Sequence, residues 1–170
     1  PHLSYLRFNF SAGQKKRYAE IMGVPQSDFD VVVQNIRDGM EIINRDSLPC
    51  TLNMQMVLDP RDADQIIPFA ELVAELKPVY GIIKHCADDA SGTLGVNYSK
   101  YAALKEDLLT AEEIGRHAGV RITAKWDKIQ SEGKRHYTRC LGSPFIMKIS
   151  GSGLVANCGF HFNERFKKFH

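Results

Sequence analysis

The sequence lacks several features that would assign a protein to a class at once. No stretch approaches the roughly 20 consecutive apolar residues that a membrane-spanning helix needs. No charged segment followed by an apolar one marks a signal peptide at the N-terminus. The 22 basic and 20 acidic residues leave a formal charge of only +2, too small for bulk charge to attract nucleic acid or a membrane surface. We therefore expect a cytoplasmic protein that binds neither.

Cysteine is also scarce. The chain of 170 residues has four cysteines, too few and too scattered for a disulfide scaffold: Cys50, Cys86, Cys140 and Cys158. An initial methionine is absent, and the last residues form a basic and aromatic run at 165–169. We interpret the chain as an interior part of a longer polypeptide.

What the sequence does contain is an alternation of strand and helix patterns. Residues 3–10, 51–58, 79–85 and 120–126 read as strands, and the segments between them carry apolar residues at helical spacing. Helices are expected at 15–22, from Ser27 or Asp30 to about residue 43, around 67–76, and from a Ser99 cap to Gly119. Three successive βα units predict an α/β fold with parallel strands and helical crossovers.

The pattern changes after about residue 130. Residues 145–149 and 154–157 read as two short strands on either side of Gly151 and Gly153, which predicts a β-hairpin. We therefore expect one domain at 1–130 and the start of a second at 131–170.

Three of the predicted strands have a polar side. This is unusual because strands of a parallel sheet covered on both faces are apolar throughout. In a closed or partly closed barrel, such side chains would line a cavity whose functional end lies at the carboxyl ends of the strands. The cations would favour an anionic ligand; alternatively, the polar sides face water at a sheet edge. The residues concerned are Arg7, Asn9 and Ser11, then Asn53 and Gln55, then Arg121, Thr123 and Lys125, with Lys84 and His85 ending the third strand.

The segment CLGSPFIMKISGSGLVANCG at 140–159 carries the most specific pattern. Cys140 is followed after twelve residues by Gly153 and, after four more, by Cys158. This resembles the opening of the SPASM domain of radical S-adenosylmethionine enzymes. The resemblance implies that Cys140 and Cys158 ligate an auxiliary four-iron four-sulfur cluster, with the glycine turning the hairpin that brings them together.

Residues 3–127 resemble the later βα units of the partial (β/α)6 TIM-like barrel of the same family. The segment LRFNFSAG resembles the fourth barrel strand, although Ala12 stands where relatives often have an acidic residue. The resemblance implies that the cofactor S-adenosylmethionine contacts Asn9, Ser11, Gly13, Asn53 and Gln55. The basic residues Arg7, Lys84, His85 and Lys125 would then face the substrate.

The family's Cys-x-x-x-Cys-x-x-Cys motif and the later SPASM cysteines are not in these residues. The resemblance therefore implies that the parent protein is the enzyme and that this segment alone is inactive. It also implies a small-molecule or peptide substrate and an electron donor such as flavodoxin or ferredoxin. Two alternatives remain open: a non-catalytic binding module on the same scaffold, and an unrelated α/β enzyme acting on a phosphorylated metabolite.

Overall fold

The computed structural model describes residues 3–88, 92–134 and 137–162. The chain divides into two compact units. The first, which we call the sheet unit, comprises Pro1–Asp88 and Leu94–Gly133; the second, the hairpin unit, comprises Asp89–Thr93 and Lys134–His170. Among the described residues, no helix is long and apolar enough to cross a membrane.

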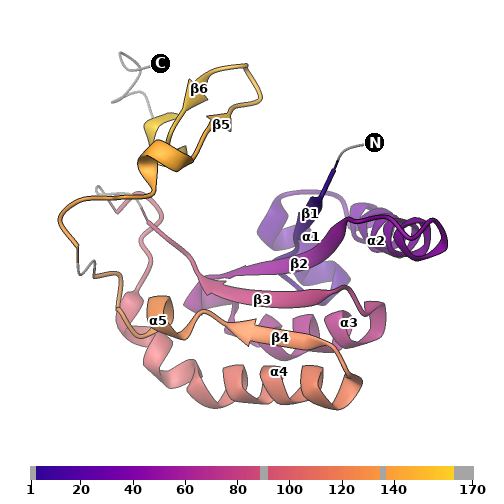
Figure 1. Ribbon diagram of the computed structural model, residues 1–170. Coiled ribbons are helices and arrows are strands. Elements are labelled where there is room, and N and C mark those ends of the chain that lie inside the picture. The colour runs from indigo at the N-terminus through magenta and orange to yellow at the C-terminus, as the bar shows by residue number, and fades with distance from the viewer. Residues whose placement is uncertain (1–2, 89–91, 135–136, 163–170) are drawn as a thin grey trace. The chain divides into compact units, whose positions relative to one another are not determined.

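The sheet unit is built on a four-stranded parallel sheet with the strand order β1-β2-β3-β4 (Figure 1). Its strands are β1 (Tyr5–Asn9), β2 (Thr51–Leu58), β3 (Tyr80–His85) and β4 (Arg121–Ala124). Each strand lies beside the next one in the sequence. The α/β class, the parallel sheet and the helical crossovers are therefore as the sequence predicts.

The helices connect the strands and continue beyond the last one. The first crossover holds α1 (Lys15–Met22) and α2 (Ser27–Arg45), the second holds the 3₁₀ helix η1 (Pro60–Gln65) and α3 (Ile66–Leu76), and the third holds η2 (Tyr98–Leu104) and α4 (Lys105–Ala118). A short helix, α5 (Trp126–Ile129), follows β4. The predicted stop at Gly119 is confirmed, because Gly119 ends α4 with a left-handed φ of 72°.

Helices α1 to α4 all pack on one face of the sheet (Figure 1). Tyr18 of α1 stacks on Phe10, and a Cβ at Gly39 of α2 would lie 3.0 Å from Leu52. Helices α3 and α4 approach the sheet as closely. A Cβ at Gly81 of β3 would lie 3.0 Å from Val73 of α3, and a Cβ at Gly115 of α4 would lie 2.7 Å from Ile122 of β4. Right-handed crossovers between sequential neighbours place every helix on the same side, which explains the one-sided cover.

Two predicted boundaries are wrong. The helix before Gly119 is not capped by Ser99: the 3₁₀ helix η2 starts at Tyr98, and the Ser99 hydroxyl donates to Asn97 Oδ1 instead. The fourth strand does not reach Trp126. It ends at Ala124, and Lys125 is the N-cap residue of α5. Lys125 therefore does not share a strand face with Arg121 and Thr123.

The hairpin unit contains the predicted antiparallel hairpin. Its strands, β5 (Lys148–Ile149) and β6 (Val155–Ala156), pair as Lys148 with Ala156 and Ile149 with Val155. Gly153 in the turn has a φ of 83°, which an L side chain rarely adopts. The strands are shorter than the predicted 145–149 and 154–157, and Phe145 belongs to the 3₁₀ helix Ser143–Phe145.

Candidate functional site

The sheet face opposite α1 to α4 is polar, and the strand register arranges its side chains in rows. Arg7, Asn53, Tyr80 and Arg121 form one row near the amino ends of the strands. The next row toward the carboxyl ends is Asn9, Gln55, Ile82 and Thr123. We call this surface the polar face. The structure thus brings together predicted residues from strands far apart in the sequence.

The row near the amino ends is a closed hydrogen-bond network. Three donors converge on the Tyr5 hydroxyl: Arg7 Nη2, Asn53 Nδ2 at 2.5 Å and the Tyr80 hydroxyl at 3.3 Å. Partial burial opposes the effect, yet the hydrogen bonds from Tyr80, Asn53 and Arg7 hold the pKa of Tyr5 below its usual range. Arg7 and Asn53, predicted as ligand contacts, are thus engaged with each other and with Tyr5.

Tyr5 and Tyr80 are members of this network that the sequence analysis did not single out. The signal for Tyr5 was present, because strand alternation places it on the same side as Arg7. Arg121, at the start of β4, lies over the Tyr80 ring with its guanidinium carbon 5.3 Å from the ring centroid. The hydrogen bonds join the amino ends of β1, β2 and β3, and the contact between Arg121 and the Tyr80 ring adds β4.

Nearer the carboxyl ends, the predicted cofactor contacts Asn9, Gln55 and Ser11 lie close to one another. Gln55 Nε2 donates to Asn9 Oδ1 at 2.7 Å, and Ser11 Oγ accepts the Val57 N–H at 3.3 Å. Gln55 and Ser11 are buried, whereas Asn9 is exposed. A hydroxyl can accept and donate at once, so accepting the Val57 N–H does not prevent Ser11 from donating to a ligand.

The three predicted basic residues at this end have different surroundings. Lys84 is half-buried and follows Ile82 on the polar face, since alternate strand residues share a side. Lys125 is exposed just beyond β4, and its backbone N–H donates to Ile83 O at 2.8 Å. His85 belongs to the opposite face by the same alternation, where its ring lies near Tyr98 and Tyr101. The structure therefore separates His85 from Lys84.

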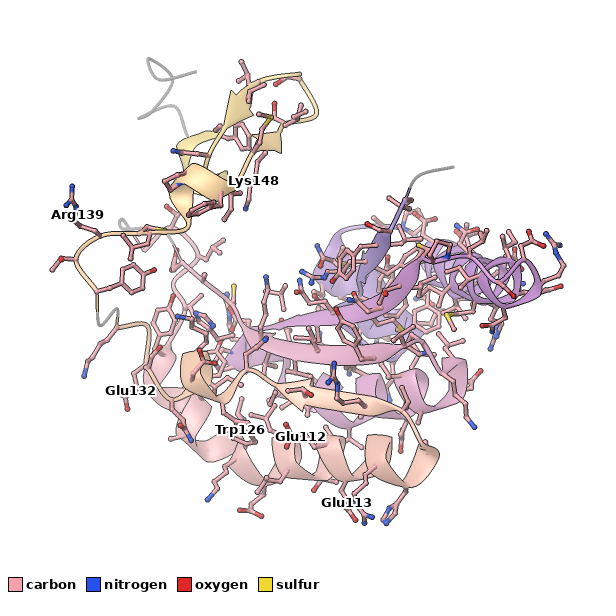
Figure 2. The ribbon with its side chains drawn as sticks, in the orientation of Figure 1. Glu112, Glu113, Trp126, Glu132, Arg139 and Lys148 are labelled. Carbon is pink, nitrogen blue, oxygen red and sulfur yellow. The ribbon has the colours of Figure 1, made fainter. Side chains whose placement is uncertain are left out.

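The junction between β4 and α5 depends on Glu112, which no local sequence pattern marks. Glu112 of α4 accepts from the Ala124 N–H at 2.8 Å and from Trp126 Nε1 at 3.0 Å. Figure 2 shows Glu112 and Trp126 side by side at this point. A glutamate in a helix normally reads as a solvent-facing residue, but here it ends the strand and so fixes the position of Lys125.

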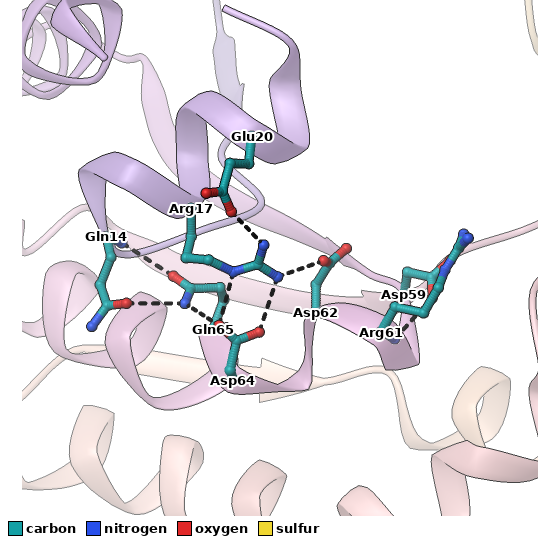
Figure 3. Close-up of polar contacts among 8 residues, drawn as sticks. All are labelled: Gln14, Arg17, Glu20, Asp59, Arg61, Asp62, Asp64 and Gln65. Atoms are coloured by element: carbon teal, nitrogen blue, oxygen red, sulfur yellow. Dashed lines mark hydrogen bonds and ion pairs between the residues drawn. The ribbon is translucent and has the colours of Figure 1, made fainter. Parts of the chain in front are cut away.

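An ion pair follows the end of β2. Asp59 is buried and caps η1 by accepting the Arg61 N–H at 2.9 Å, and its carboxylate also accepts from Arg61 Nε and Nη2 (Figure 3). These hydrogen bonds hold the pKa of Asp59 below its usual range, against the opposing effect of burial. Nearby, burial and the charges of Asp59 and Asp88 raise the pKa of the Cys86 thiol. Cys86 is therefore a protonated thiol at neutral pH.

His85 should make the stability of the sheet unit depend on pH. Burial, together with the positive charges of Lys128 and Lys84, lowers the pKa of His85 below its ordinary value of 6.5, while Asp127 opposes this. The unfolded chain therefore takes up a proton first as the pH falls below about 6.5. The contribution of neutral His85 to the stability of the folded state is fully present above about pH 6.5. It is lost as the pH falls from about 6.5 through the lower pKa that His85 has in the folded state.

We therefore expect urea denaturation of the wild type to show lower stability at about pH 5.5 than at about pH 7.5. His85→Gln should reduce this difference, because glutamine does not titrate in this range. His117→Gln, at an exposed position on α4, is the matched control and should keep the difference. An unchanged pH dependence in His85→Gln would contradict the assignment.

The predicted metal ligands lie in the hairpin unit. Cys140 is exposed and Cys158 half-buried, neither is in a disulfide, and the β5–β6 hairpin lies between them in the sequence. Within residues 3–88, 92–134 and 137–162, no group of three or more His, Cys, Asp or Glu side chains is arranged to hold a metal ion. Iron-sulfur clusters of this kind are typically held by four thiolates, so Cys140 and Cys158 would supply two of them.

Comparison with known proteins assigns no family to the chain, so a function has to be inferred from the residues themselves. No protein-family model matches the sequence. No curated protein matches it either.

Proposed function

We propose that the chain is part of a radical S-adenosylmethionine enzyme. In this proposal, the sheet unit supplies four consecutive strands of a partial (β/α)6 barrel, and the polar face lines the cofactor and substrate cavity. The hairpin unit begins an auxiliary iron-sulfur domain. One observation carries the proposal: a sequentially ordered parallel sheet has α1 to α4 on one face and polar side chains on the other.

The physical support for a barrel segment is the burial of amides on a sheet face. Asn53 is fully buried and Gln55 is 4% exposed, although both lie in the middle of a strand. Burial of such groups is unfavourable unless they are hydrogen-bonded, and here they bond to Tyr5, Arg7 and Asn9 across the polar face. If further strands closed this sheet into a barrel, the polar face would line its interior, where a polar ligand needs polar groups.

Within this proposal, some residues at the carboxyl ends of the strands bind the cofactor and others bind the substrate. Ser11, Asn9 and Gln55 offer a hydroxyl and amides that would hold S-adenosylmethionine, which supplies the radical when bound to its cluster. Lys84 and Lys125 bring positive charge to the same end and would favour a substrate with a carboxylate or phosphate group. Arg7 would instead stabilise the amino-end network with Asn53 and Tyr5, so we propose that its contact with substrate is indirect.

The auxiliary cluster is proposed to bind through the Cys140 and Cys158 thiolates. The residues present fit in kind, since iron-sulfur clusters are held by thiolates and neither cysteine is in a disulfide. They fit only in part, since two of about four ligands are provided. The cluster would orient the substrate or pass an electron.

Iron analysis tests this proposal. The intact protein, reconstituted with iron and sulfide without oxygen, should lose about four irons per chain in Cys140→Ala and in Cys158→Ala. The visible absorption of the cluster should fall in parallel. Cys50→Ala, at a half-buried position outside the hairpin unit, is the matched control and should keep the wild-type iron content. Equal iron in all three variants would rule out the ligand assignment.

A second candidate is a binding module for an anionic small molecule, which the positions of Lys84 and Lys125 favour. Sequence upstream of Pro1 distinguishes the two, because a three-cysteine motif there supports the enzyme. A protein that binds a phosphorylated ligand in air, without iron, would support the module.

A further inference from the structure

The segment between β1 and α1, residues 11–14, is in contact with α3 and with the residue that precedes it, Gln65. It contains Ser11 and Gly13, two of the residues proposed to contact the cofactor. At Gly13 a Cβ would lie 2.0 Å from the Pro68 carbonyl carbon, so this backbone rests directly on α3. The next residue, Gln14, is the N-cap of α1, and its side chain makes no capping hydrogen bond.

Gln65, from another element, makes two hydrogen bonds to Gln14. Its Oε1 accepts the Gln14 backbone N–H at 3.2 Å, and its Nε2 donates to Gln14 Oε1 at 3.1 Å (Figure 3). Gln65 is fully buried, and it lies at the end of η1, 51 residues away in the sequence. A buried amide that makes reciprocal hydrogen bonds to one residue fixes both its distance and its orientation.

Arg17 makes a second connection between the same two elements. From α1 its guanidinium donates to Asp62 at 2.9 Å and to Asp64 at 2.9 Å, both on η1, and to Glu20 at 2.8 Å on its own helix (Figure 3). Asp64 also accepts from Gln65 Nε2 at 2.8 Å, so the two connections share one carboxylate. The hydrogen bonds from Arg17 and Gln65 keep the pKa of Asp64 below its usual range.

We propose that Gln65 and Arg17 are positioning residues that hold residues 11–14 in the geometry that binds the adenosyl cofactor. The inference rests on the proposed function for the identity of the ligand. A leucine would fill the space of Gln65, but it would leave the Gln14 backbone N–H without this acceptor. The amide instead connects the loop after β1 to the segment after β2, and these two loops end neighbouring strands. Neither residue touches the proposed site directly, so their effect passes through the backbone of Gly13 and Gln14.

The first test needs no ligand. Gln65→Leu removes both hydrogen bonds to Gln14, and the Gln14 amide should exchange with solvent deuterium at least about tenfold faster, the ratio that corresponds to one lost hydrogen bond. Gln34→Leu, at an exposed position of α2, is the matched control and should leave this rate unchanged. An equally slow Gln14 amide in Gln65→Leu would overturn the proposed role.

The second test measures affinity for S-adenosylmethionine in the intact reconstituted protein. Gln65→Leu and Arg17→Ala should each weaken binding by about tenfold. Arg45→Ala, which breaks an exposed pair with Asp46, is the control for Arg17. Unchanged affinity with a fast Gln14 amide would show that the connection exists but does not position the ligand, which overturns the inference.

Gln65→Glu provides a readout that a purely structural role would not give. At about pH 8 its carboxylate would lie beside Asp64 and would have no proton to donate to Gln14 Oε1; near pH 6, protonation of a buried carboxyl with a raised pKa would restore the donor. Affinity relative to wild type should therefore recover as the pH falls, and a ratio independent of pH would count against the inference. If the wild type itself binds no S-adenosylmethionine, the proposed function is wrong, and so is the part of the inference that names this ligand. The exchange experiment would still show whether Gln65 holds Gln14.

Discussion

Gly13→Ala is expected to destabilise the sheet unit by about 3 kcal/mol, at the upper end of the usual cost of overpacking. The added Cβ would lie 2.0 Å from the Pro68 carbonyl carbon, 2.1 Å from its oxygen and 2.4 Å from the Phe69 nitrogen. All three are backbone atoms of α3, which cannot turn aside as the end of a side chain can. The helix or residues 11–14 must therefore move. Urea denaturation with a cofactor-binding measurement would show both effects.

The matched control is Gly39→Ala in α2. There the added Cβ would lie 3.0 Å from the Leu52 Cδ1 atom, the flexible end of a side chain. Alanine is also favoured over glycine inside a helix by roughly 0.5–1 kcal/mol, so this variant should be close to neutral. Gly13 does not have a positive φ, so its effect is steric and not one of backbone strain. Equal stability of the two variants would mean that residues 11–14 do not rest on α3.

Local patterns in the sequence predict most of the fold. The strand at 51–58 matches β2, because apolar residues alternate along it and the Asp59-Pro60 turn follows. The ends of the helices at 15–22 and before Gly119 are also predicted, because Gly23 and Gly119 suit a left-handed C-cap. These features are determined by residues close together in the sequence, and a periodic pattern of apolar residues reveals such local structure.

The site is less predictable because its contacts join residues far apart in the sequence. Alternation placed Asn53 and Gln55 on one side of a strand, but the partners of these amides on β1 follow only from the register of the sheet. Lys125 was assigned to a strand because the alternation continues to Trp126, whereas the tertiary hydrogen bonds of Glu112 end the strand earlier. No local signal marks Gln65, since its role depends on Gln14, 51 residues away.

Phe10→Ala is expected to have the second large effect, a loss of about 3–5 kcal/mol in the free energy of unfolding. Phe10 is fully buried at the end of β1. Its ring stacks on Tyr18 of α1 with 4.6 Å between centroids, and it meets Phe29 of α2 at 5.3 Å. Truncation would leave a cavity between the strand and both helices. Against a typical total stability of about 5–15 kcal/mol, much of the folded population could be lost.

The same change tests how the core supports the binding end of the polar face. Phe10 directly precedes Ser11, so a cavity here should loosen residues 11–14 even where the sheet remains folded. Phe10→Leu, which keeps most of the apolar volume, should restore part of the stability and of the cofactor affinity together. Phe145→Ala, at a position 88% exposed in the hairpin unit, should change stability by less than about 0.5 kcal/mol. Full stability in Phe10→Ala would mean that the ring cluster does not hold α1 and α2 on the sheet, and the positions of Ser11 and Gly13 would then need another cause.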